Sequence, residues 1–140
     1  MFSDYFEDWE VKPEYSKQFV SLWSGWLGAE NCHKLDEVTA DEWSRFNDLL
    51  KNIANDFALE LANFEDLSLI HIVDVESVLS TYEESMSKTS SEFINVVVPA
   101  LGCVISEEWD YTYIIWHKNN GAVEALDPYI KAACLEHFHD

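Results

Sequence analysis

The segment Phe93–Trp116 (FINVVVPALGCVISEEWDYTYIIW) is the longest stretch in which β-branched and aromatic residues are dense. Such residues suit a pleated, half-buried surface. The run predicts strands at Phe93–Val98, Cys103–Ile105 and Tyr111–Trp116. Between the last two, the polar stretch Ser106–Asp110 predicts a connecting loop, because it interrupts the apolar pattern with carboxylates. We therefore expect a sheet on which the rest of the chain packs.

Apolar residues at helical spacing precede this run. One such series predicts a helix over Glu14–Leu27. A second helix is predicted over Ala40–Asn63, because Thr39 and Glu42 have the spacing of a capping box. Its apolar stripe, which we expect to pack on the sheet, consists of Trp43, Phe46, Leu50, Ile53, Phe57, Leu61 and Phe64.

The remaining segments complete the expected order of elements. Leu67–Val73 fits either a short buried strand or the lead-in to a helix, and we favour the strand. Asp74 is expected to cap a third helix that runs to about Met86. Asn119-Asn120-Gly121 is typical of a tight hairpin turn, which predicts a returning strand over Ala122–Leu126. Asp127-Pro128 then predicts the start of a final helix. The sequence thus predicts a single α+β domain over residues 1–140, with N-terminal helices packed on a mainly antiparallel sheet and a C-terminal helix.

The chain is strongly acidic, with 27 Asp and Glu against 8 Lys and Arg and a formal net charge of −19. Because 48% of its residues are hydrophobic, we expect a folded core under an acidic surface rather than a disordered tail. This charge excludes non-specific binding to nucleic acid or to anionic lipid. It serves either solubility or the binding of a basic partner, and the sequence leaves both alternatives open.

No motif of a catalytic, phosphate-binding or metal site is present. Cys32-His33 is a single adjacent pair, whereas a structural zinc site needs four ligands at workable spacings. We therefore expect neither an enzyme nor a cofactor or metal. Three cysteines without CxxC spacing and the absence of a long apolar stretch favour a cytoplasmic protein that does not enter a membrane.

Two acidic and aromatic blocks are the candidate partner-binding residues. The first consists of Glu107, Glu108, Trp109 and Asp110, where one tryptophan lies among carboxylates. The second, a less certain edge of the same interface, consists of Asp4, Asp8 and Trp9. A rigid aromatic anchor among charges is typical of a binding hot spot. The alternative is that Trp109 folds back onto the sheet and leaves the carboxylates to water.

In size, acidity and these two blocks, Asp4–Glu10 and Ser106–Asp110, the chain resembles the small acidic immunity proteins of bacterial contact-dependent or polymorphic toxin systems. The resemblance implies a cognate toxin domain, commonly a basic nuclease, whose active site or substrate-binding face is blocked. The alternative is an acidic mimic of nucleic acid that inhibits a DNA-binding host enzyme. Such a mimic would also use its negative charge to bind a cationic groove. The sequence does not indicate an oligomeric state.

Overall fold

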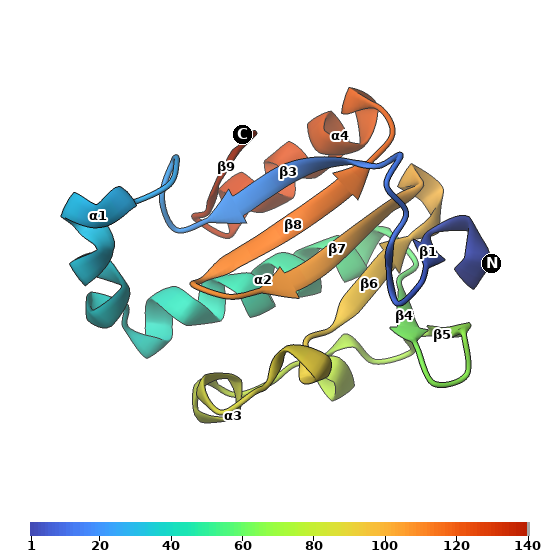
Figure 1. Ribbon diagram of the computed structural model, residues 1–140, viewed down its shortest axis with the longest axis horizontal. Helices are drawn as coiled ribbons and strands as arrows, with labels where there is room; N and C mark the ends of the chain where they lie inside the picture. The colour runs from blue at the N-terminus through green and yellow to red at the C-terminus, as the bar shows by residue number, and fades with distance from the viewer. Residues whose placement is uncertain (140) are drawn as a thin grey trace.

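A seven-stranded antiparallel sheet with two long helices on one face forms the body of the protein in the computed structural model, which describes residues 1–139 (Figure 1). The strand order is β5-β4-β6-β7-β8-β3-β9. The strands are β3 (Ser16–Ser21), β4 (Glu60–Asn63), β5 (Ser68–His71), β6 (Asn95–Val98), β7 (Cys103–Glu108), β8 (Thr112–His117) and β9 (Glu136–Phe138). The α+β class and the mainly antiparallel sheet are confirmed.

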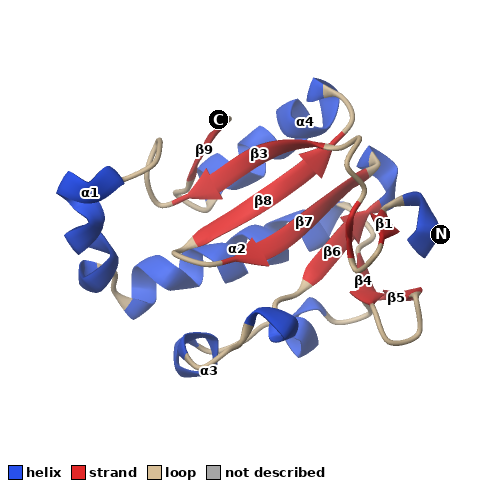
Figure 2. Ribbon diagram, in the orientation of Figure 1, coloured by secondary structure: helices blue, strands red, loops and turns tan. Residues whose placement is uncertain are grey.

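Helices alternate with the strands along the chain and are drawn in blue in Figure 2. The α-helices are α1 (Gly28–Asn31), α2 (Ala40–Asp56), α3 (Tyr82–Met86) and α4 (Asn120–Ala132). Short 3-10 helices are η1 (Phe2–Asp4), η2 (Cys32–Glu37), η3 (Val75–Val78), η4 (Ser90–Glu92) and η5 (Pro99–Leu101). A separate hairpin consists of β1 (Phe6–Glu7) and β2 (Glu10–Val11).

The main core lies between the sheet and the helices α2 and α4. Four residues of α2 are almost fully buried there: Phe46, Leu49, Leu50 and Ile53. They meet Val20, Val96, Ile105 and Ile115 of the sheet and Leu126 and Ile130 of α4. Burial of each such side chain stabilises the fold by about 1.5–3 kcal/mol. This layer therefore fixes the sheet on which the surface features described below are built.

The opposite face of the sheet is covered in part by the N-terminal hairpin (Figure 1). Phe6 is buried there against Val97 and Val104, and its ring meets Phe64 edge-on at 5.1 Å between centroids. The N-terminal block of acidic and aromatic residues is thus a packed element rather than a free arm. The face beyond it, along β3, β8 and the end of β7, lies outside this hairpin.

Several local predictions are confirmed. The three predicted strands correspond to β6, β7 and β8, and β5 lies within the predicted Leu67–Val73 strand. At the start of α2, Thr39 Oγ1 accepts a hydrogen bond from the Glu42 backbone N–H at 3.1 Å, and the Thr39 N–H donates to the Glu42 carboxylate at 3.1 Å. This is the expected capping box. Polar side chains that compete for backbone groups mark helix starts reliably.

The predicted helix over Glu14–Leu27 is wrong, because this segment contains strand β3. In the sheet, β3 lies between β8 and β9. At its C-terminal end, Val20 packs in the main core, while Phe19 is covered on the other face by the rings of Trp26 and Phe138. Phe19 and Val20 therefore point to opposite faces and are both buried. A strand covered on both faces loses the alternation of polar and apolar residues, so its period cannot be told from that of a helix.

The second predicted helix ends too late. α2 stops at Asp56, and Phe57 takes an extended conformation with φ −128° and ψ 142°. The apolar series continues past this point because Leu61, on β4, packs against the same core as α2. The apolar residues predicted as one helical stripe therefore belong partly to α2 and partly to β4. Of the expected core stripe, Trp43, Phe46, Leu50 and Ile53 are buried, whereas Phe57, Leu61 and Phe64 are only half-buried.

The predicted hairpin turn at Asn119–Gly121, the strand over Ala122–Leu126 and the helix start at Asp127-Pro128 are all wrong. This segment is the single helix α4, with Asn119 as its N-cap residue. Asparagine is favoured at the N-cap as well as in turns. Ala122, Leu126 and Ile130 are spaced four apart and form the buried face, while Pro128 lies on the exposed side. The helix therefore continues through the proline.

The third predicted helix is split in two. Asp74 does act as a cap, since its Oδ1 accepts from the Glu76 N–H at 3.1 Å, but the helix that follows is the short η3. Thr81 and Glu84 then form a second capping box that begins α3. Two N-cap signals seven residues apart mark two helices, because a cap is made at a helix start.

Candidate protein-binding surface

Trp109 lies at the tip of the hairpin that joins β7 to β8. Its indole ring meets the ring of Phe93 edge-on at 4.7 Å between centroids, yet 58% of the residue is exposed. The next two residues, Asp110 and Tyr111, have positive φ angles of 59° and 55°. Two successive positive φ angles are typical of a tight hairpin turn, and the tip of the N-terminal hairpin has the same pair at Asp8 and Trp9. The turn leaves Trp109 at the exposed end of the hairpin.

The predicted loop over Ser106–Asp110 is shorter in the structure. Ser106, Glu107 and Glu108 belong to β7, and their partners across the hairpin are Ile114, Tyr113 and Thr112. Successive residues of a strand point to opposite faces. Glu107 therefore faces the helices, whereas Glu108 faces the opposite side of the sheet.

Glu107, one of the predicted partner-binding residues, offers little surface to a partner. It is only 7% exposed, and its Oε1 lies 2.8 Å from the Lys88 ammonium group. The same oxygen accepts a hydrogen bond from the Ile94 backbone N–H at 3.1 Å. Glu107 thus ties the segment before β6 to the sheet and has a structural role. The sequence did not predict this structural role, because the local pattern around Glu107 does not show that Lys88 lies next to it in the fold.

Glu108 lies on the open face and is held by a relay of hydrogen bonds. The Trp116 indole N–H donates to Ser106 Oγ at 2.9 Å, and the Ser106 hydroxyl donates to Glu108 Oε2 at 2.8 Å. Ser106 is buried, while Glu108 is partly exposed. The relay fixes the orientation of the carboxylate.

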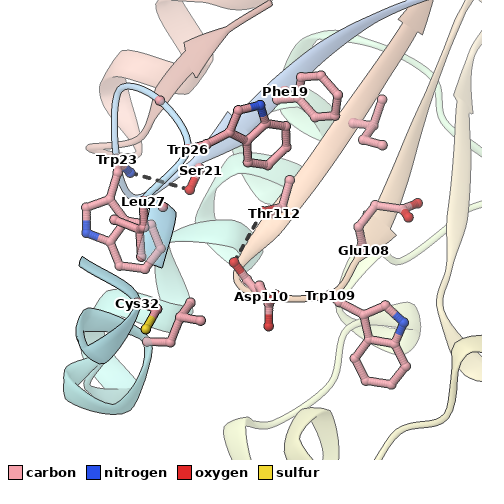
Figure 3. A pocket seen from close by; sticks show the side chains of 14 residues that line it. Phe19, Ser21, Trp23, Trp26, Leu27, Cys32, Glu108, Trp109, Asp110 and Thr112 are labelled. Atoms are coloured by element: carbon pink, nitrogen blue, oxygen red, sulfur yellow. Dashed lines mark hydrogen bonds between the residues drawn. The ribbon is translucent and has the colours of Figure 1, made fainter. Parts of the chain in front are cut away.

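A hollow of about 430 Å³ lies beside this hairpin, between it and the segment that follows β3 (Figure 3). Figure 3 shows Trp23 and Trp26 on the β3 side of the hollow and Glu108, Trp109 and Asp110 on the other side. The floor is formed by strand residues that include Phe19, Ser21, Thr112 and Ile114. Among the described residues that line it, none is a lysine, arginine or histidine.

Trp23 and Trp26 were not singled out as binding residues from the sequence. Their spacing with Tyr15, Phe19 and Leu22 suggested a helix face in the core. Yet Trp26 is 56% exposed and its ring meets Phe19 edge-on at 4.6 Å between centroids. Ser24 and Gly25 between the two tryptophans were the available signal, because such residues interrupt an apolar series at a turn.

Asp4, Asp8 and Trp9 are not brought together with Trp109. The N-terminal hairpin lies at the opposite end of β7 from the β7–β8 turn (Figure 1). Asp4 is ion-paired with the N-terminal ammonium group at 2.9 Å, and this contact holds the pKa of its carboxyl below its usual value. Asp8 and Trp9 form the hairpin tip, and Trp9 is 68% exposed. The N-terminal block and the block around Trp109 therefore do not form one continuous surface.

Over residues 1–139, no three His, Cys, Asp or Glu side chains cluster as metal ligands would. Cys32 Sγ donates to the Ala29 carbonyl at 3.2 Å. Burial raises the pKa of the Cys103 thiol to about 12, which disfavours a nucleophilic thiolate at neutral pH.

His137 lies in strand β9. Its Nε2 is 2.7 Å from Asp127 Oδ1 and its Nδ1 is 2.7 Å from Gln18 Nε2. A neutral imidazole with its proton on Nε2 satisfies both contacts, since it donates to the carboxylate and accepts from the amide. These contacts join α4, β3 and β9, and no nucleophile lies among them.

Comparison of the chain with protein-family models, with curated proteins and with solved structures returned no match. None of the helices in residues 1–139 combines the length and apolarity that a bilayer crossing requires.

Proposed function

We propose that this chain is an immunity protein that binds a basic, nuclease-like toxin domain and neutralises it by covering its active site or substrate-binding face. The observation that carries the proposal is the pairing of exposed tryptophans with carboxylates. Trp26 and Trp109 stand on either side of the hollow, with Glu108 and Asp110 next to Trp109. Tryptophan is enriched among the residues that dominate binding energy at protein interfaces.

The charge of the whole molecule supports the same kind of partner. A net charge of −19 draws a cationic domain toward the surface from a distance and raises the association rate at low salt. A nuclease has a basic face because it must hold phosphates. A protein that covers this face competes with the nucleic acid, and it needs no catalytic group of its own.

The aromatic residues favour an immunity protein over a mimic of nucleic acid. A mimic needs carboxylates at the positions of phosphates. Here the partly exposed Glu108 lines the same hollow as Trp26 and Trp109, with Phe19 and Ile114 in its floor, a setting that suits side chains of a protein partner. The core of a protein–protein interface is rich in aromatic residues, and its rim is polar.

The experiment begins with the domain encoded by the reading frame beside the gene for this chain. We expect that domain to be basic and to arrest growth when it is expressed alone, and to be harmless when this chain is co-expressed. Trp109→Ala is expected to lose protection, whereas Trp9→Ala, at the tip of the other hairpin, is expected to keep it. Circular dichroism of both variants checks that the fold is retained.

Two further measurements test the nature of the binding. Association with the basic domain is expected to slow by about tenfold or more between about 50 and 500 mM salt, with a much smaller change in dissociation. A neighbouring product that is neither basic nor toxic would contradict the proposal. Binding instead to a host DNA-processing enzyme, with release by duplex DNA, would identify a nucleic-acid mimic.

A further inference from the structure

The hollow on the open face of the sheet has the size and composition of a site for an organic cation. Its volume of about 430 Å³ falls within the range of about 300–1,000 Å³ that is usual for pockets that hold a small ligand. We propose that it receives an arginine side chain presented by the partner, with Glu108 as the ion-pairing carboxylate and Trp26 as the aromatic wall. This inference rests on the proposed function and names the group that the partner contributes.

The aromatic wall is rigid. The Trp26 ring is held edge-on against Phe19 at 4.6 Å and against Phe138 at 5.0 Å between centroids. These contacts fix the ring, while 56% of the residue still faces solvent. Trp23 lines the same side of the hollow (Figure 3). The face of a tryptophan ring attracts a cation, and arginine is the side chain most often found there.

The carboxylate is held in place on the other side. Ser106 orients Glu108 through a hydrogen bond of 2.8 Å and is itself fixed by the Trp116 indole at 2.9 Å. Asp110 adds a second carboxylate to the rim. No cation of the described chain lines the hollow to neutralise these charges. A fixed anion beside an aromatic wall, without a cation of its own, is complementary to a guanidinium group.

The same face of the sheet already shows this chemistry within the chain. The Lys17 ammonium group lies 4.9 Å from the centroid of the Trp116 ring, on the strand pair β3–β8. Arginine fits the hollow better than lysine, because its planar guanidinium can stack on an indole and donate two parallel hydrogen bonds to one carboxylate. A lysine ammonium is a compact and more strongly hydrated charge.

The test uses two short peptides as probes, acetyl-Gly-Arg-Gly-amide and its citrulline counterpart, which has the same shape without the charge. The indole N–H signals of Trp26 and Trp109, assigned by Trp→Phe variants, are followed by NMR during titration of the whole chain. The arginine peptide is expected to shift both signals in a saturable way, at millimolar concentration. The citrulline peptide is expected to leave them in place. Equal shifts with both peptides would overturn the proposal.

Matched variants localise the effect. Glu108→Gln is expected to weaken binding of the arginine peptide by about tenfold, and Trp26→Leu by about threefold. Glu124→Gln removes the same charge from the exposed side of α4, on the other face of the sheet, and is expected to change the affinity less than twofold. If Glu124→Gln and Glu108→Gln weaken binding equally, the peptide senses only net charge and the site is refuted.

The peptide test and the test of the proposed function fail independently. Saturable binding of the arginine peptide by a chain that gives no protection would contradict the immunity function and support the cation site. Protection that persists in both Glu108→Gln and Trp26→Leu would support the immunity function, and it would overturn the assignment of the hollow as the place where the partner's arginine binds.

Discussion

Lys88 Nζ lies 2.8 Å from Glu107 Oε1, and both side chains are nearly buried. This pair joins the segment between α3 and β6 to the middle of the sheet. Removal of one partner of a buried pair leaves the other charge uncompensated, which costs about 3–5 kcal/mol. We therefore expect Glu107→Gln to lower the free energy of unfolding by about 3 kcal/mol, as measured by urea denaturation.

The neighbouring carboxylate supplies the control for this prediction. Glu108 points to the other face and is partly exposed, so we expect Glu108→Gln to change stability by less than about 1 kcal/mol. Equal losses of unfolding free energy in the two variants would contradict the assignment of Glu107 to the buried face of β7 and of Glu108 to the open face. A charge reversal of both residues together is expected to lower the thermal midpoint, because Glu107 is part of the fold.

The core of α2 gives a second prediction. Phe46 is 1% exposed and packs against Tyr113 at 4.8 Å between ring centroids. We expect Phe46→Ala to cost about 3–5 kcal/mol of unfolding free energy. Phe57 follows the end of the helix and is half-buried, so Phe57→Ala is expected to cost clearly less. The reverse order in thermal or urea unfolding would place the main core around Phe57 instead.

Pro128 tests whether α4 is one helix. A proline within a helix removes one backbone hydrogen bond and is about 3 kcal/mol less favourable than alanine there. Replacement also frees the unfolded chain, which offsets about 0.4–1 kcal/mol. We therefore expect Pro128→Ala to stabilise the protein by about 1 kcal/mol or more. A neutral or destabilising effect would indicate that a helix begins at Pro128, as the Asp127-Pro128 pair had suggested.

Asp127 provides a prediction of pH dependence. The hydrogen bond from His137, together with that from Lys131, holds the pKa of its carboxyl below the usual 3.8. A lowered folded-state pKa adds stability that is complete above the unfolded-state pKa and is lost as the pH falls through the folded-state pKa. Wild type is therefore expected to be more stable than Asp127→Asn at pH 6, and the gap is expected to close below about pH 4.

Urea unfolding at a series of pH values measures this gap directly. A constant difference between wild type and Asp127→Asn from pH 6 to pH 2 would mean that the charge of Asp127 contributes nothing. A gap that widens toward low pH would contradict the sign of the shift.

Strand and helix-cap signals in the sequence predicted much of the fold. Val96–Val98 and Cys103–Ile105 lie in central strands, where β-branched residues are packed from both sides. Thr39 and Glu42 mark a helix start through bonds made within four residues. Such local chemistry is readable because it depends on few neighbours. β3 was missed because Val20 and Phe19 are covered on opposite faces by residues distant in sequence, such as Leu126 in the core and Phe138 on the other side.

The candidate site was predicted in part. Trp109 and Asp110 are exposed at a hairpin tip. The cluster of carboxylates around a tryptophan had predicted a connection between two strands at this point. The opposite orientations of Glu107 and Glu108 follow from the strand register, which depends on the pairing of β7 with β8. The hollow also requires Trp26, which is distant in sequence and reaches the site through β3. The sequence around Trp109 therefore could not predict that Trp26 lines the same hollow.

The affinity of the basic partner domain for two charge-reversed variants tests the central claim most directly. Glu108→Lys and Glu124→Lys change the net charge of −19 by the same amount, but only Glu108 lines the hollow. A like charge at a binding site costs several kcal/mol, so Glu108→Lys is expected to raise Kd by about 100-fold or more. Glu124→Lys is expected to raise it less than about threefold. Equal increases in the two variants would contradict the claim that the partner binds at this surface.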